Sequence, residues 1–194
     1  MRYEQACVKA FEDKMKYGKF RQTHGITYPG KPEPSADKEE TMKVDEASKD
    51  VEIVVMYFGA GRGPLIRRAL AAAKKTKANV KVIALDKNPN AIVTLRNMII
   101  DENLQDRVSL VAGDMRHVSV DAMKGDILMS ELLGSFGDNE LSPECLNPTE
   151  KYLRPGGIYL PWSYTNNVLP LSSQYLWNEV TVYAHQGISG RVQL

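Results

Sequence analysis

The chain has 194 residues, of which 43% are hydrophobic and 25% are charged, and its formal net charge is +1. This composition is typical of a globular domain with its own core. The near-neutral charge argues against direct binding of nucleic acid through a basic surface, and no apolar run reaches the roughly 18 residues of a membrane-spanning helix, so no membrane partner is expected.

Two separated cysteines, Cys7 and Cys145, and three scattered histidines give no metal-site pattern, so no metal is predicted. The first residues lack the apolar core of a signal peptide. A cytoplasmic and nuclear location is therefore expected.

The first two segments of the chain differ in composition. Residues 1–17 carry apolar side chains at helical spacing and predict an amphipathic helix. No capping residue precedes this helix, so the chain is expected to begin inside an element. Residues 18–50 combine clustered glycine and proline with a mixed charged run, which is typical of a flexible linker or surface insertion.

Residues 51–161 alternate apolar strands with helical segments. Strands are expected at 53–58, 80–85, 108–112, 126–130 and 157–160, and helices at 65–75, 88–103 and 148–153. This alternation predicts an α/β fold, a Rossmann-like parallel sheet with helices on both faces. Gly59, Asp86, Asp114 and Glu131 each follow a strand. Because ligands bind outside the carboxyl ends of such strands, these residues are expected to face one crevice.

The turn after the first strand has the pattern Gly-x-Gly-x-Gly at Gly59, Gly61 and Gly63. The pattern alone is also compatible with a plain tight turn. Asp86, at the end of the second strand, can accept hydrogen bonds from both ribose hydroxyls of a nucleotide. Pro64 stands where a dinucleotide site would have glycine, and no phosphate-binding Gly-Lys-Ser/Thr motif is present. A nucleoside without phosphates, S-adenosylmethionine, is therefore favoured.

Two residues after the third strand are candidates for binding the base of that nucleoside. Asp114 could meet the adenine amino group while Met115 packs on the ring. Asp114 is equally suited to capping the following helix. Both interpretations stay open at this point.

The loop after the fourth strand carries two glutamates, Glu131 and Glu140, nine positions apart. They could be solvated surface charges. The apolar residues between them, Leu132, Leu133 and Phe136, favour a loop that folds back instead.

These segments resemble the protein arginine methyltransferases, and specifically the type II enzymes that make symmetric dimethylarginine. The resemblance rests on residues 59–65, 86–91, 114–116 and 130–146, and it spans residues 51–183. It implies methyl transfer from S-adenosylmethionine to arginine side chains of proteins. The chemistry agrees, because a planar guanidinium, always protonated at physiological pH, matches a pair of carboxylates. Positioning and electrostatics then favour attack on the sulfonium methyl.

The resemblance also implies individual roles. Glu131 and Glu140 are the implied catalytic pair, and the residues do not decide which of them takes the departing proton. The helix of residues 1–17 is expected to lie over the cofactor site. The implied cofactor contacts are Arg2, Tyr3, Gly59, Gly61, Asp86, Asp114 and Met115. The family usually has lysine at position 2 and glutamate at position 86, so the shorter Asp86 has less reach toward the ribose.

Implied partners are arginine-containing protein substrates, among them histone tails and glycine-arginine-rich proteins. A WD-repeat partner is expected only in the longer family form, which carries an N-terminal TIM barrel. Residues 162–194 resemble the start of the family's β-barrel substrate domain, and that barrel is expected to be incomplete here.

Three other functions compete with this interpretation. One is a non-catalytic truncated isoform or fragment that binds cofactor or partner without turnover, because the aromatic lid upstream of Tyr3 and most of the barrel are missing. Another is a small-molecule methyltransferase, which the glutamate pair disfavours because a neutral substrate needs no carboxylate clamp. A nicotinamide dehydrogenase is disfavoured by Pro64.

Overall fold

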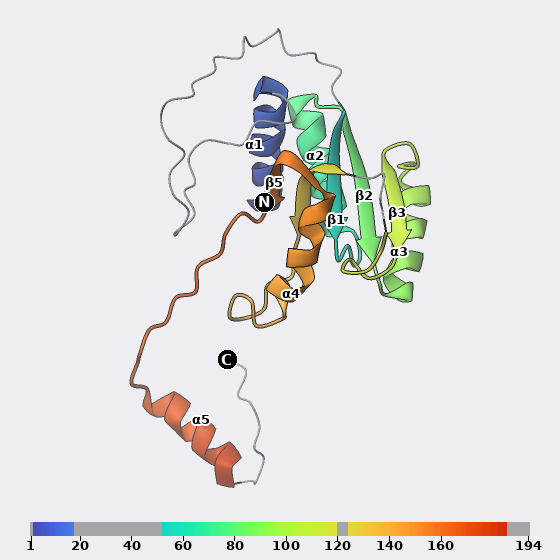
Figure 1. The fold of residues 1–194 in the computed structure, drawn as a ribbon. Coiled ribbons are helices and arrows are strands. Elements are labelled where there is room, and N and C mark those ends of the chain that lie inside the picture. Colours follow the sequence, from blue (N-terminus) through green and yellow to red (C-terminus); the bar gives the residue numbers. More distant parts are fainter. Residues whose placement is uncertain (1, 18–51, 120–123, 186–194) are drawn as a thin grey trace, which may run out of the picture. The chain divides into compact units, whose positions relative to one another are not determined.

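The structure, a computed structural model, describes residues 2–17, 52–119 and 124–185 (Figure 1). The predicted linker at 18–50 lies outside the described residues. The chain divides into two units, one ending at Tyr164 and the other beginning at Thr165.

A five-stranded sheet forms the centre of the first unit. Its strands are β1 (Ile53–Phe58), β2 (Val80–Asp86), β3 (Val108–Ala112), β4 (Gly125–Ser130) and β5 (Leu153–Leu160). They run in the order β3-β2-β1-β4-β5, and all neighbouring pairs are parallel. The predicted α/β, Rossmann-like sheet is confirmed. The strand order reverses between β1 and β4, which is where ligands bind in such sheets.

The residues of β1 alternate between two buried cores. Ile53, Val55 and Tyr57 pack beneath α1 (Arg2–Tyr17), α2 (Pro64–Thr76) and α3 (Pro89–Asp101). The residues between them join the core on the other face, which includes Tyr152. Figure 1 shows α1 and α2 side by side on the first face. Since both faces of β1 are covered, its sequence is apolar throughout and does not alternate between apolar and polar residues.

Local signals explain where the two central helices begin. Each has proline in its first turn, where no amide hydrogen is needed. The α3 helix is also capped by Asn88, whose side chain accepts a 2.9 Å hydrogen bond from the backbone N–H of Asn90. The predicted helices at 65–75 and 88–103 are confirmed, the second one two residues shorter at its end.

The segment before β5 differs from its prediction. The helix expected at 148–153 is a short α-helix, α4 (Ser142–Leu146), followed by a 3-10 helix, η1 (Asn147–Tyr152). β5 begins directly afterwards at Leu153, not at 157. The sequence Pro155-Gly156-Gly157 obscured this start, but β5 is an edge of the described sheet, where proline is tolerated.

Among residues 165–185, the described part of the second unit, there is one helix, α5 (Gln174–His185), which the sequence analysis did not predict. Residues 165–173 have no regular structure, and no strand occurs among residues 165–185. The expected start of a β-barrel stays a prediction. In the described ranges, no helix is long and apolar enough to cross a membrane.

A buried charged cluster lies at the amino ends of β1 and β4. Asp126 is fully buried, and its Oδ2 accepts hydrogen bonds from the backbone N–H of Val54 (2.8 Å) and from Nη1 of Arg154 (2.7 Å). Lys14 of α1 is 1% exposed, and its Nζ donates to the carbonyl of Gly156. Burial lowers the pKa of Lys14, and the carboxylates of Asp13 and then Asp126 oppose that shift. The cluster ties α1 to the sheet.

Candidate functional site

The carboxyl ends of the central strands are joined by backbone hydrogen bonds. The N–H groups of Gly59 and Ala60, just after β1, donate to the carbonyl of Leu85 in β2 (3.0 and 3.1 Å). The N–H of Gly113, just after β3, donates to the carbonyl of Asp86 (2.9 Å). The strand ends predicted to share one crevice are therefore adjacent.

The glycine turn has a geometry that requires glycine. Gly59 and Gly61 have φ angles of 69° and 54°, which side chains other than glycine rarely adopt. A Cβ on Gly59 would stand 3.1 Å from Cδ2 of Leu132 and 3.9 Å from Cε of Met115. A Cβ on Gly61 would meet no atom within 4 Å. The turn is thus packed against two site loops at Gly59 and open to an approaching ligand at Gly61.

Asp86 braces this turn. It is 8% exposed, and its Oδ2 accepts from the N–H of Gly61 (2.7 Å) while its Oδ1 accepts from the N–H of Asn88 (2.8 Å). Each carboxylate oxygen has a further lone pair, so both can still accept from a ribose hydroxyl. The short aspartate arm therefore has a role that the sequence analysis missed, which is to hold the glycine turn in place.

We expect Asp86→Asn to weaken S-adenosylmethionine binding by at least about tenfold. The amide NH₂ would face the backbone N–H of either Gly61 or Asn88, so one hydrogen bond would be lost. A hydrogen bond to a charged group contributes about 1.5–3 kcal/mol of free energy, and about 1.4 kcal/mol corresponds to a tenfold change in affinity. Isothermal titration calorimetry measures the affinity. Asp101→Asn, an exposed change of the same kind on α3, is the control. Equal affinity in both variants would contradict this role of Asp86.

The carboxylate of Asp114 is hydrogen-bonded to Arg116. Its Oδ1 accepts from the backbone N–H (3.0 Å) and Nε (2.9 Å) of Arg116, and its Oδ2 accepts from Nη2 of the same arginine (2.6 Å). These contacts hold the pKa of Asp114 well below its usual range. The backbone contact caps a turn at residues 115–117 and not a helix, since no helix occurs among residues 114–119. An adenine contact stays a prediction and would use the remaining lone pairs.

Tyr3 lies at the carboxyl end of β4. Its hydroxyl donates to the carbonyl of Ser130 (3.0 Å), directly before Glu131. Burial, and then the charge of Glu131, raise the pKa of Tyr3 to about 12. The same two causes raise the pKa of Tyr57 above its ordinary value. Arg2 is exposed, and its predicted cofactor contact stays a prediction.

The glutamate loop folds back on itself. The N–H of Gly134 donates to the carbonyl of Gly137 (2.9 Å), and Cγ of Glu140 lies 2.8 Å from where a Cβ on Gly134 would stand. Glu140 therefore returns to a point three residues after Glu131. Both glutamates are exposed, and neither forms an ion pair with any described residue. The arrangement offers two uncompensated carboxylates to a cation.

Two residues at the site were missed by the sequence analysis. Tyr57 was read only as part of an apolar strand, although its place next to the end of β1 was a usable signal. Leu132 was read only as an apolar loop residue, and it packs on Gly59. Among the described residues, no group of three or more His, Cys, Asp or Glu side chains could hold a metal ion.

Comparison with known proteins gives a consistent result. Residues 1–160 match the family model described as PRMT5 arginine-N-methyltransferase. Protein arginine N-methyltransferase 5 of Oryza sativa subsp. indica is 46% identical over 150 residues, covering 75% of this chain and 23% of the relative. The Xenopus laevis protein of the same name is 47% identical over 139 residues, covering 71% and 22%. The chain thus spans less than a quarter of the length of these relatives.

One solved structure supports the fold. The crystal structure of Arabidopsis thaliana protein arginine methyltransferase 10 matches with a TM-score of 0.50 at 23% identity. The match covers 56% of this chain and 30% of that chain. At this identity the likeness concerns the arrangement of strands and helices.

Proposed function

Because the chain belongs to the PRMT5 arginine-N-methyltransferase family, we propose that it transfers methyl groups from S-adenosylmethionine to arginine side chains of proteins. One observation carries the proposal beyond the family match. The loop with Glu131 and Glu140 packs through Leu132 on Gly59 of the glycine turn. The loop that carries the two proposed catalytic carboxylates therefore contacts the turn proposed to bind the cofactor.

The residues around the glycine turn fit S-adenosylmethionine. The open space at Gly61 admits a ligand to the backbone, and Asp86 has lone pairs left for ribose hydroxyls. Asp114 and Met115 would hold the adenine. When bound, S-adenosylmethionine supplies an electrophilic methyl group on its sulfonium.

The residues around Glu131 and Glu140 would position the substrate arginine. A carboxylate pair can bind a guanidinium through several charge-assisted hydrogen bonds, which fixes its plane. Fixed charges act without reorganising during the reaction, so they favour the transition state over the free substrate. Tyr3 contributes by holding the carbonyl of Ser130, which fixes the backbone from which Glu131 projects.

Finer features are proposed from the resemblance of residues 130–146 to type II enzymes. The product would be symmetric dimethylarginine, formed on histone tails and glycine-arginine-rich proteins in the cytoplasm and nucleus. Residues 162–194 would form the start of a β-barrel substrate domain. A WD-repeat partner would bind only longer family members.

The proposal is tested by titrating the purified chain with S-adenosylmethionine in a calorimeter and assaying methyl transfer to a glycine-arginine-rich peptide. We expect saturable binding and methylarginine in the product, identified by mass spectrometry. A matched peptide with lysine in place of arginine is the control and should remain unmodified. Binding without transfer would favour the alternative, a chain that binds cofactor or partner without turnover. Absence of binding would overturn the cofactor assignment.

A further inference from the structure

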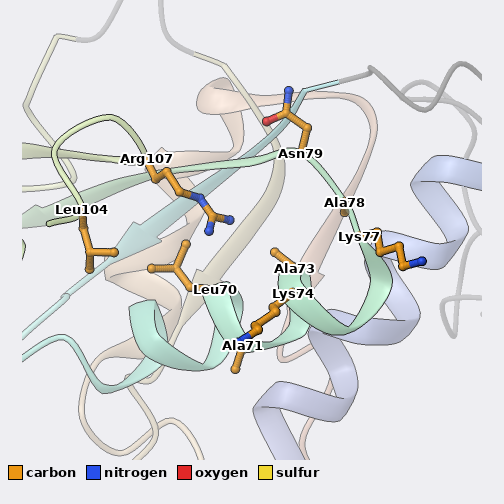
Figure 2. Close-up of a pocket in the computed structure, with 9 residues that line it drawn as sticks. All are labelled: Leu70, Ala71, Ala73, Lys74, Lys77, Ala78, Asn79, Leu104 and Arg107. Carbon is orange, nitrogen blue, oxygen red and sulfur yellow. The ribbon is translucent and has the colours of Figure 1, made fainter. Parts of the chain in front are cut away.

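A hollow of about 510 Å³, whose lining residues are shown in Figure 2, lies at the end of the sheet opposite to the candidate site. Its wall includes the end of α2 and the residues just before β2 and β3, whereas the candidate site lies at the carboxyl ends of these strands. Its floor is apolar and includes Leu70, Ala73, Ala78 and Leu104. The hollow is therefore independent of the proposed catalytic machinery.

Three cationic side chains, Lys74, Lys77 and Arg107, line this hollow, and no acidic residue does. Figure 2 shows Arg107 extending over the hollow toward Leu70. Within the described part of the chain, none of the three cations has an ion-pair partner. Their charge is therefore uncompensated around an apolar floor.

The other cations of α2 form ion pairs. Arg68 and Lys75 both pair with Glu4 of α1, and Arg67 pairs with Glu102 (2.6 Å). Among the cations of α2, Lys74 is thus the exception, and the near-neutral chain has no general basic excess to explain the three cations of the hollow.

We propose that the hollow is a docking site for an acidic peptide segment of a partner protein that carries an apolar side chain. Leucine and alanine on the floor would receive the apolar side chain, and the three cations would pair with flanking carboxylates. A nucleic acid or free phosphate fits less well. Free phosphate would leave the apolar lining unfilled, and no aromatic side chain lines the hollow on which a nucleobase could stack.

The test measures binding of a short fluorescein-labelled peptide of glutamate and aspartate with one central leucine, by fluorescence anisotropy with the full chain. We expect saturable binding that Lys74→Glu/Arg107→Glu weakens by at least about tenfold, since lost rim pairs become like-charge contacts. Lys9→Glu/Arg96→Glu makes the same charge change on exposed positions outside the hollow and should bind as the natural chain does. Replacing the central leucine with serine should also weaken binding.

Several outcomes would overturn the proposal. They are no binding, an equal loss in both charge-reversed variants, or no effect of the leucine replacement. If a single-stranded oligonucleotide bound more tightly than the peptide and was weakened by Lys74→Glu/Arg107→Glu, the ligand of the hollow would be a nucleic acid and not a peptide. If light scattering showed a dimer that Lys74→Gln/Arg107→Gln abolishes, the hollow would bind a second copy of this chain and not a peptide of another protein. None of these readouts depends on methyl transfer, so the proposed function stands or fails separately.

Discussion

Glu140→Gln is expected to lower the rate of arginine methylation by at least about 100-fold while the affinity for S-adenosylmethionine is retained. The substitution keeps the shape of the side chain and removes one of the two charges that would hold the guanidinium. Removal of one group that stabilises developing charge costs about 100- to 1000-fold in rate. Glu140 lies against Gly134 in the returning loop and not on the glycine turn, so the cofactor site should be unaffected. Single-turnover methyl transfer and calorimetry measure the two quantities.

Glu144→Gln is the matched control for this variant. Glu144 is exposed in α4, four positions further along the chain, and loses the same charge. We expect it to methylate at the natural rate. A normal methylation rate in the Glu140 variant would show that Glu140 is not one of the catalytic pair. An equal loss of rate in both variants would indicate a general effect of charge.

Asp126→Ala should lower the free energy of unfolding by about 3–5 kcal/mol, the usual result of removing one partner of a buried ion pair. The change leaves Arg154 without its carboxylate and leaves the backbone N–H of Val54 without its acceptor. It also removes one of the two negative charges, those of Asp13 and Asp126, that favour protonation of buried Lys14. Urea unfolding followed by circular dichroism gives the free energy.

The control is Glu102→Ala, which breaks the Arg67–Glu102 pair (2.6 Å). Both of its side chains are well exposed, at 51% and 38%. Exposed pairs contribute less than about 1 kcal/mol, so this variant should be close to the natural chain. A comparable small loss in the Asp126 variant would show that the buried cluster does not hold α1 on the sheet.

The stability of this cluster bears on the site because α1 is anchored near both ends of β4. Lys14 bonds to Gly156 at the amino end of the sheet, and Tyr3 bonds to Ser130 at the carboxyl end. Eleven residues of helix rise about 16 Å, comparable to the length of a short strand. A loosened cluster would therefore also release the backbone next to Glu131.

Parts of the fold were predictable because their signals are local. The apolar run at 53–58 predicted a strand buried on both faces, and the structure buries all six residues. Asn88-Pro89 marked the beginning of α3 through the capping side chain and the fixed φ of proline. β5 was predicted too short, because Pro155 and Gly156 are weak strand formers, and they lie where the register with β4 shifts between Gly125 and Ile127.

The sequence by itself determined where α1 to α3 and β1 to β4 lie and which polar residues follow those strands, because side-chain periodicity and turn chemistry depend on near neighbours in the chain. Only the tertiary structure decided what those residues contact. It placed Asp86 on the N–H of Gly61 and Tyr3 on Ser130, and it enclosed Asp126 with Arg154. These partners are 25, 127 and 28 residues apart. Such contacts depend on strand order and helix docking, which are set by burial of the whole core and leave no pattern in either segment alone.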